Sequence, residues 1–305
     1  MRLYLPARDQ SAFESICLDT IREFDLDRSR ISLHFVEVGD SGSRKAAMQA
    51  RDRAIVADAK LLLPVSVRSG GGMAALVDSA RGEQSVDRTF ECRERDTATS
   101  LQYTLSTAEL TSNARDIGSD YLIHWTRTSP GVWPGERAID YYAAVLSSSR
   151  HPRSAFDTIE RIATERYLYA STRHMPRKTP CVSFTGLRPH DAVPLMRWRA
   201  RYGQMTFEPY GLGIKRTVAE RMGIAPVTYY DVSQKSAIAT LPAWRTQSRG
   251  VITNWQAENE YRHCGDLDLS PVPDDALVLF CRFEHEVESL AQATGIRTIP
   301  MFTGE

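Results

Sequence analysis

Apolar positions in the first third of the chain follow two alternating patterns. Apolar runs of strand length occupy residues 1–5, 31–38 and 61–67, and the last of these is nearly continuous. Apolar residues at helical spacing mark the segments 11–24, 44–57 and 73–80. A continuous apolar strand is typical of a parallel sheet that is covered on both faces. The alternation therefore predicts a Rossmann-like α/β domain, which we assign to residues 1–112.

The remaining residues, 113–305, mix short strands and helices in a less regular order. Strands are predicted at 121–126, 182–185, 207–215, 226–230, 277–282 and 297–302. Helices are predicted at 137–146, 155–167, 189–202, 217–222 and 284–294. The segment 255–262 fits a strand, or a strand that borders a helix. Together these elements predict an α+β domain.

The composition indicates the class of protein, but it says little about which partners the protein binds. The 305 residues are 42% apolar and 25% charged, as in an ordinary globular protein, and the 38 basic residues balance the 38 acidic ones. No apolar run approaches the roughly 18 residues that a membrane span needs, and no signal peptide opens the chain, so we expect a cytoplasmic protein without membrane contact. The five cysteines form no CxxC pair, which argues against a structural metal site.

One stretch is strongly basic. Residues 150–216 contain 13 Lys and Arg against five Asp and Glu, a net charge of +8. This excess favours a phosphate-rich ligand, or it belongs to a solvated helix face. A nuclease is disfavoured, because no acidic cluster with metal-binding spacing accompanies the basic residues.

A glycine-rich turn follows the third strand of the N-terminal part. Arg68 is followed by Ser69, and then Gly70, Gly71 and Gly72 open a helix. A glycine-lined helix N-terminus can bind a phosphate through its free N–H groups, although the same sequence also suits a tight turn without a ligand. Residues 51–73 resemble the nucleotide-binding Rossmann families related to LOG proteins, often called SLOG. The acid of their hydrolase members is missing at 73–76, so the resemblance implies nucleotide binding and not phosphoribosyl hydrolysis.

Polar residues gather at the ends of four predicted strands of the C-terminal part. They are His124, Thr126 and Arg127; Ser183 and Thr185; Glu208 and Tyr210; and Glu258, Glu260 and Arg262. On a strand, residues two apart face the same side, so the two glutamates of the last set are expected to share one space, where their repulsion raises one pKa. The alternatives are a solvent-facing row of charges, a core histidine, and hydroxyls that bond nearby backbone.

The order of these sets resembles the ADP-ribosyltransferase fold. Its members carry His or Arg on a first strand, a Ser/Thr motif on a middle strand and a glutamate, often within an ExE motif, on a later strand. HWTR at 124–127, SFT at 183–185 and ENE at 258–260 follow that order. Residues 122–290 also resemble AbiGi-antitoxin-like families of bacterial phage defence, through HWT, VSFT at 182–185, YGLGI at 210–214 and WQAENEYR at 255–262.

The resemblance implies a role for each residue. His124 or Arg127 would hold the adenosine ribose or the pyrophosphate of NAD, which is a substrate and not a tightly bound cofactor. Tyr210 or Trp125 would stack on the nicotinamide. Glu260 would bind the nicotinamide ribose and stabilise the oxocarbenium-like state, and Glu258 would position or deprotonate the acceptor. Thr126, Ser183, Thr185 and Arg262 would line the pocket.

Two functions are therefore consistent with the sequence. The first is an NAD-consuming ADP-ribosyltransferase or NAD glycohydrolase with a nucleotide-binding N-terminal module, whose acceptor is a protein or a nucleic acid. The second is a nucleotide-sensing or antitoxin-like protein that uses the same folds without catalysis.

Overall fold

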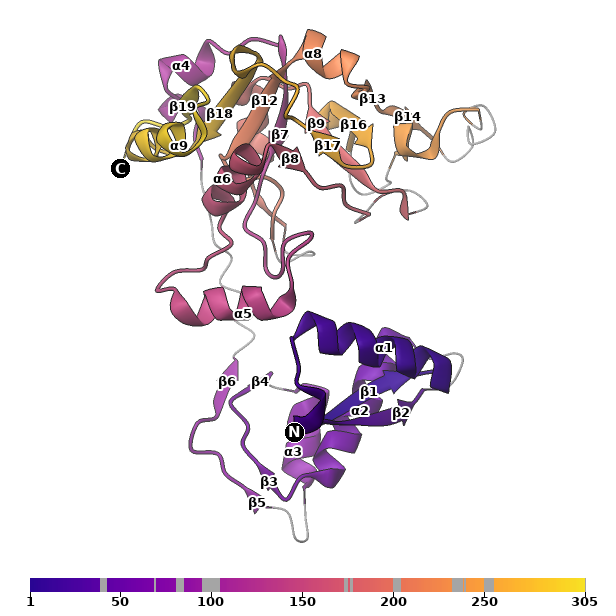
Figure 1. The fold of residues 1–305 in the computed structure, drawn as a ribbon. Helices are drawn as coiled ribbons and strands as arrows, with labels where there is room; N and C mark the ends of the chain where they lie inside the picture. Colours follow the sequence, from indigo (N-terminus) through magenta and orange to yellow (C-terminus); the bar gives the residue numbers. More distant parts are fainter. Residues whose placement is uncertain are drawn as a thin grey trace. The chain divides into compact units, whose positions relative to one another are not determined.

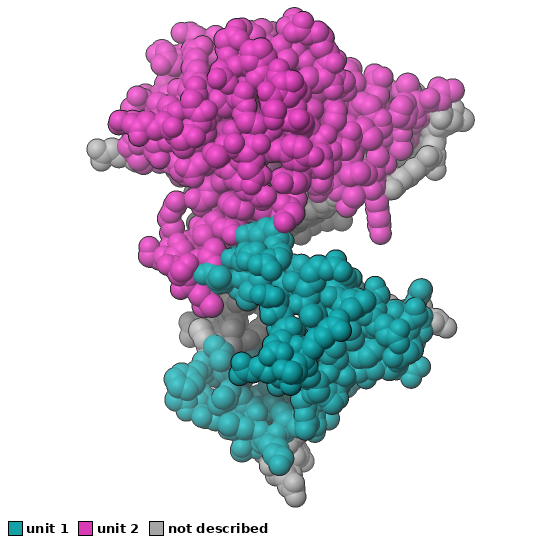
Figure 2. Space-filling model, viewed as in Figure 1, with its two compact units in different colours: residues 1–99, 136–143 teal, residues 100–135, 144–305 magenta. Residues whose placement is uncertain are grey.

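The computed structural model describes residues 1–38, 43–68, 70–80, 85–94, 105–172, 175, 178–199, 204–231, 238, 240–249 and 255–304. At residues 66, 68, 92–94 and 255 only the backbone is described. Ser69 of the glycine turn and part of the basic stretch (173, 174, 176, 177 and 200–203) lie outside these ranges. The chain divides into two compact units, which Figure 2 colours separately: unit 1 comprises residues 1–99 and 136–143, and unit 2 comprises residues 100–135 and 144–305.

Unit 1 begins with the predicted alternation of strands and helices (Figure 1). The helices predicted at 11–24, 44–57 and 73–80 are confirmed. The first begins where Asp9 accepts a hydrogen bond from the Ala12 N–H, and the second where Ser43 accepts one from the Ala46 N–H. The elements are β1 (Arg2–Ala7), α1 (Gln10–Glu23), β2 (Ser32–Glu37), α2 (Arg44–Asp58), β3 (Leu61–Leu62), β4 (Ser66–Arg68), α3 (Gly72–Ser79), β5 (Ser85–Val86) and β6 (Cys92–Glu94).

The prediction of one continuous strand at 61–67 is wrong. The segment is split into β3, which pairs with β5, and β4, which pairs with β6. Pro64 lies between them. It has no N–H to donate to a neighbouring strand, and it restricts the backbone conformation of Leu63. Leu61, Leu63 and Val65 are each more than half exposed. In the described residues the parallel pairs β1–β2, β3–β5 and β4–β6 are separate sheets, so the Rossmann-like architecture stays a prediction.

Unit 2 is built on a mixed sheet, which has seven strands among the described residues and is flanked by helices of the same unit (Figure 1). Its strand order is β13-β16-β9-β7-β12-β18-β19, and neighbouring strands are antiparallel except β18 and β19. The strands are β7 (Tyr121–Trp125), β9 (Cys181–Thr185), β12 (Gly211–Lys215), β13 (Ala225–Pro226), β16 (Glu260–Cys264), β18 (Leu277–Cys281) and β19 (Thr298–Pro300).

Helices and short strand pairs complete this unit. The helices are α4 (Ser112–Arg115), α6 (Ala155–Glu165), α7 (Pro189–Ala192), α8 (Arg216–Arg221) and α9 (Val287–Thr294), while α5 (Ala138–Ser147) spans the division between the units. The short pairs are β8 (Tyr167–Leu168) with β17 (Leu267–Asp268), β10 (Trp198–Arg199) with β11 (Gln204–Met205), and β14 (Thr228–Tyr230) with β15 (Thr246–Ser248). Among the described residues, no helix has the length and apolarity that crossing a membrane requires.

Alternating side chains of the central strands bury both faces of the sheet. On β18, Leu277 and Leu279 belong to one apolar cluster together with residues of α6, α8 and α9. Val278 and Phe280 belong to a second cluster together with residues of α4 and α7. This alternation is what a pleated strand covered on both sides requires. The sheet therefore provides a rigid frame for side chains at its strand ends.

Gly211 is the first residue of β12, where it packs closely against β7. A Cβ atom at this position would lie 2.6 Å from Cε3 of Trp125 and 3.0 Å from the His124 carbonyl oxygen. Glycine is therefore needed so that the Trp125 ring can pack against the strand.

Replacing Gly211 by Ala is expected to lower the free energy of unfolding by about 1–3 kcal/mol, because the added methyl group overpacks a buried contact. Urea unfolding of the full chain measures this. Gly131→Ala is the matched control, since its Cβ would meet nothing within 4 Å. Equal stability of the two variants would contradict the packing argument.

The sheet opens between β7 and β9. Among the described residues, these strands share one facing pair, Ile123 and Thr185, whereas β7 faces β12 over five residues. Before Thr185, the same edge of β9 is bound by another segment: Ser171 and Cys181 exchange two backbone hydrogen bonds of 2.9 and 3.1 Å. The end of β7 and the beginning of β9 therefore diverge, which leaves room for a cavity.

The long helix predicted at 189–202 is also wrong. The α-helix ends at Ala192, a 3-10 turn follows over Val193–Leu195, and Trp198–Arg199 then forms β10. Pro194 explains the end of the helix, because a proline inside a helix removes a hydrogen bond and clashes with the preceding turn. As a result, Arg199 lies on a strand that borders the cavity and not on a solvated helix face.

Candidate functional site

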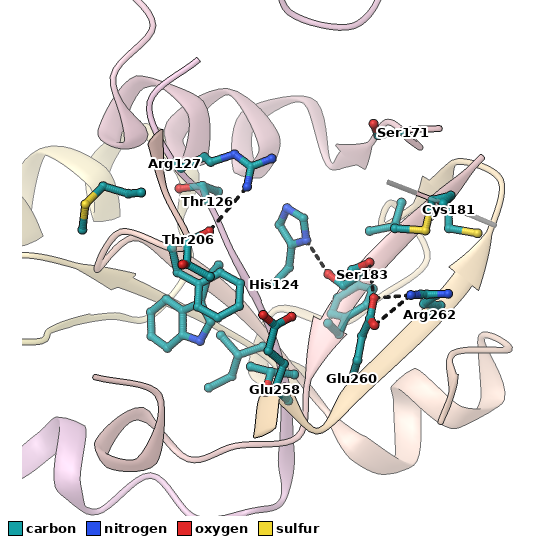
Figure 3. Close-up of a pocket in the computed structure, with 18 of the residues that line it drawn as sticks. His124, Thr126, Arg127, Ser171, Cys181, Ser183, Thr206, Glu258, Glu260 and Arg262 are labelled. Atoms are coloured by element: carbon teal, nitrogen blue, oxygen red, sulfur yellow. Dashed lines mark hydrogen bonds and ion pairs between the residues drawn. The ribbon is translucent and has the colours of Figure 1, made fainter. Parts of the chain in front are cut away.

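A cavity of ≈ 520 Å³ lies where β7 and β9 diverge (Figure 3). Its walls come from the end of β7, all of β9, the hairpin β10–β11, and the segment that leads into β16. Of the predicted site residues, those that line it are His124, Thr126, Arg127, Ser183, Thr185, Glu258, Glu260 and Arg262.

His124 bridges the opening between the two strands. Its Nδ1 lies 2.7 Å from the Ser183 carbonyl oxygen, on the edge of β9 that faces β7 (Figure 3). Because a carbonyl can only accept, Nδ1 carries the hydrogen, and Nε2 of the neutral ring is left as an acceptor. Burial lowers the pKa of His124; the Ser183 carbonyl opposes this lowering, and the Arg127 charge adds to it. The histidine therefore offers a neutral acceptor.

Glu260 is held by two neighbours through both carboxylate oxygens. Oε1 accepts from the Ser183 hydroxyl at 2.9 Å and from Arg262 Nε at 2.7 Å, while Oε2 accepts from Arg262 Nη2 at 2.8 Å. The Glu260 side chain is 11% exposed and that of Arg262 only 3%. Oε2 has room for a further donor, because a carboxylate oxygen has two lone pairs. Glu260 can thus bind a hydroxyl group without losing its supports.

Arg262 is anchored beyond this pair. Its remaining N–H groups reach the carbonyl oxygens of Trp244 and Thr246 and the Gln247 side chain, at 3.1, 3.5 and 3.0 Å. All five guanidinium donors are therefore used. The arginine fixes the Glu260 carboxylate relative to the segment 244–247.

Glu258 reaches the same cavity by a different route from the one predicted. It lies in a 3-10 turn, Trp255–Glu258, and not on a strand, and Asn259 after it has a left-handed φ of 44°. The turn is tied to β9, because the Thr185 hydroxyl donates to the Glu258 carbonyl oxygen at 2.5 Å and the Gly186 N–H donates to that of Asn259 at 2.9 Å. Both glutamates therefore line one cavity, but the strand geometry expected for Glu258 is wrong.

The carboxyl group of Glu258 is poised to exchange a proton near neutral pH. Burial first, and then the charge of Glu260, raise its pKa from 4.5 to about 7, against the lowering effect of Arg199, Arg262 and Arg127. Among these, Arg199 places Nη2 3.7 Å from Glu258 Oε1. A carboxyl group with such a pKa can act as a general acid or base.

This raised pKa predicts a pH-dependent stability. The folded chain retains the Glu258 proton longer than the unfolded chain, so the stabilising contribution is complete below pH 4.5 and is lost as the pH rises through about 7. Across that window, the free energy of unfolding should fall by roughly 3 kcal/mol more in the wild type than in Glu258→Gln. Urea unfolding at a series of pH values measures the difference. Parallel pH profiles for the two proteins would contradict it.

Arg199 is a cavity residue that the sequence did not identify, because a helix was expected there. Its Nε donates to the Thr206 hydroxyl at 2.9 Å, and Nη1 of Arg127 lies 3.4 Å from the Thr206 carbonyl oxygen. The two guanidinium groups thus flank Thr206. Arginine pairs suit phosphate oxygens, which accept from planar, forked donors. Other cavity residues without a sequence signal are Ser171, Cys181, Gln204, Thr206 and Gln247.

The side chains of three predicted residues, Tyr210, Trp125 and Thr126, contact other parts of the protein. Tyr210 does not line the cavity: it is 8% exposed and its hydroxyl donates to Glu286 Oε1 at 2.8 Å, which corrects the expected stacking on a ligand. Trp125 lines the cavity, but its ring packs on Phe280 and is 7% exposed. The Thr126 hydroxyl lies 3.1 and 3.0 Å from two backbone carbonyl oxygens, those of Ala155 and Tyr210.

The predicted glycine turn lies in unit 1, whereas the residues that line the cavity belong to unit 2. Gly70 has a positive φ of 70°, and Gly71 caps α3 without a side-chain hydrogen bond. A Cβ atom at Gly70 or Gly72 would meet nothing within 4 Å. The backbone at Gly70 requires glycine, whereas the open space beside Gly72 would also accept a side chain.

Within the described ranges, no group of three or more His, Cys, Asp or Glu side chains could hold a metal ion. Comparison of the chain with protein-family models, with curated proteins and with solved structures found no match. The geometry of the cavity is therefore the basis for assigning a function.

Proposed function

We propose that unit 2 cleaves NAD between nicotinamide and ribose, as an ADP-ribosyltransferase or an NAD glycohydrolase of the ADP-ribosyltransferase-like class. The observation that carries the proposal is the continuous set of hydrogen bonds from His124 through Ser183 to Glu260. These residues come from β7, β9 and β16, which are neighbours in the sheet. The resembling families carry His or Arg on a first strand, a Ser/Thr motif on a middle strand and a glutamate on a later strand, which is the same order along the chain.

The cavity chemistry suits the steps of such a reaction. Glu260 Oε2 accepts a hydrogen bond from a hydroxyl group of the nicotinamide ribose. The negative charge of Glu260 stabilises the ribose cation that forms as nicotinamide leaves with the bonding electrons. Nε2 of the neutral His124 ring accepts a hydrogen bond from a hydroxyl group of the adenosine ribose. Arg127 and Arg199 bind the pyrophosphate.

Glu258 completes the reaction by taking a proton. The attacking group, either water or a hydroxyl or amine of an acceptor, adds to C1 of the ribose and gives up its proton to the Glu258 carboxylate. A pKa near 7 allows this group to be ionised before the step and protonated after it. In the transferase reaction, the acceptor is a protein or a nucleic acid.

Unit 1 is proposed to bind a nucleotide at the glycine turn that opens α3, in a cytoplasmic protein of bacterial phage defence. Its support is the resemblance of residues 51–73 and the left-handed Gly70. A second function, nucleotide sensing without turnover, is favoured by one observation. The bidentate Arg262 partly neutralises Glu260, which weakens the stabilisation of a ribose cation.

The test is incubation of the full-length protein with NAD, followed by chromatography of nicotinamide and ADP-ribose. Nicotinamide release supports NAD cleavage, and free ADP-ribose in equal amount identifies hydrolysis. Binding of NAD in calorimetry without nicotinamide release, with and without added cell lysate as a source of acceptors, would favour sensing.

A further inference from the structure

Two cysteines face each other across neighbouring strands at one end of the cavity. Cys181 on β9 and Cys264 on β16 are direct partners in the antiparallel register. Side chains of directly opposed residues project from the same face of the sheet and lie close together. Both cysteines are reduced in this structure.

The backbone hydrogen bonds identify the type of this pair. The N–H and C=O groups of Cys181 both bond Ser171, on the edge of β9 away from β16. The bonds that join β9 to β16 come instead from the neighbouring residues, as in Gly265 N–H to the Pro180 carbonyl oxygen at 2.9 Å. Cys181 and Cys264 thus form a non-hydrogen-bonded pair, in which Cα atoms are about 4.5 Å apart. Disulfides span Cα separations of about 4.4–6.8 Å, so this geometry can accept one.

The two thiols differ in their exposure to solvent. Cys264 is exposed, whereas Cys181 is 3% exposed and lines the cavity. The next pairs along the same face are Ser183 with Arg262 and Thr185 with Glu260. The cysteine pair therefore closes the row of side chains that forms the candidate site, with one sulfur open to solvent.

We propose that Cys181 and Cys264 are a reversible redox modification site that a small-molecule disulfide converts to a cross-strand disulfide. The Cys264 thiolate attacks the small disulfide and releases one small thiol, which leaves a mixed disulfide on Cys264. The Cys181 thiol then loses its proton, and its thiolate attacks the Cys264 sulfur and displaces the second small thiol. Two protein thiols are oxidised, one small disulfide is reduced, and the two thiol protons end on the two released thiols.

The second step is the slow one, because burial raises the pKa of Cys181 to about 11. Its rate should rise about tenfold for each pH unit between roughly pH 7 and pH 9, in proportion to the thiolate fraction. The exposed Cys264 gives the oxidant its point of entry, and the register holds the second thiol beside it.

The test treats the reduced full-length protein with glutathione disulfide, blocks the remaining thiols by alkylation, and maps disulfide-linked peptides by mass spectrometry. The expected product is a peptide pair joined through Cys181 and Cys264, which forms faster at higher pH and is lost after dithiothreitol. Cys264→Ser, a change at an exposed position, should abolish it. Cys17→Ser, a change in unit 1, should leave it unchanged.

Two results would overturn the proposal. One is Cys264 that carries only glutathione while Cys181 stays free for alkylation after unfolding. The other is a linkage of Cys264 to a different cysteine, such as Cys92. The measurement needs neither NAD nor any other nucleotide, so its outcome is independent of the proposed function.

Discussion

Replacement of Glu260 by Gln is expected to lower nicotinamide release from NAD by about 10²–10³-fold, with the fold retained. The amide is nearly isosteric with the carboxylate, and its oxygen can still accept from Arg262 or from a ribose hydroxyl. It has no negative charge to oppose the positive charge that develops on the ribose. The loss should therefore fall on kcat, while the affinity for NAD changes little.

The measurement compares steady-state nicotinamide release and NAD calorimetry for the wild type and the variant. Glu165→Gln is a matched control, because its carboxylate pairs with Arg161 one turn away on α6. A thermal melt of each protein separates loss of charge from loss of fold. Turnover by Glu260→Gln at the wild-type rate would exclude the proposed role.

Strands of the sheet could be predicted because their apolar pattern is strong. The runs at 121–126, 182–185 and 277–282 contain residues that are buried on both sheet faces, and the structure confirms each as a strand. Polar residues at the ends of these runs were predicted to meet, and His124 and Ser183 do lie within hydrogen-bond distance. These strands could be predicted from the local sequence, because the burial of a strand leaves an apolar pattern in that strand's own residues.

The opening between β7 and β9 could not be predicted in this way. It depends on which segments pair along one edge of β9, where Ser171 occupies the side that β7 leaves. Such long-range pairing leaves no trace in local periodicity. The same is true of Arg199: apolar residues around it at helical spacing indicated a helix, and Pro194 redirected the chain into a hairpin.

Errors at Glu258 and Tyr210 have a similar origin. The sequence WQAENEYR alternates like a strand, but a positive φ at Asn259 turns the backbone just before β16 begins. The strand predicted from residue 207 begins only at Gly211, so Tyr210 lies before it, and its ring packs against Phe156 in the core. Side-chain direction at a strand end depends on where the strand starts, to within one residue.

Replacement of Arg262 by Met is expected to lower the free energy of unfolding by about 3–5 kcal/mol, the largest stability effect among the changes considered. The Glu260 carboxylate would stay buried with the Ser183 hydroxyl as its main support, and the carbonyl oxygens of Trp244 and Thr246 would lose their donor. Arg188→Met removes an ion pair whose arginine side chain is 52% exposed, and it should cost less than about 1 kcal/mol.

A double-mutant cycle then separates the charge from the packing. In Arg262→Met combined with Glu260→Gln no charge is left unpaired, so the double variant should be more stable than the sum of the single losses predicts, by roughly 1–3 kcal/mol. Urea unfolding of the four proteins at pH 8 gives the coupling, and nicotinamide release should stay low in the double variant. If the two losses of unfolding free energy are strictly additive, Arg262 acts through its contacts with residues 244–247, and its ion pair with Glu260 contributes nothing to the stability of the fold.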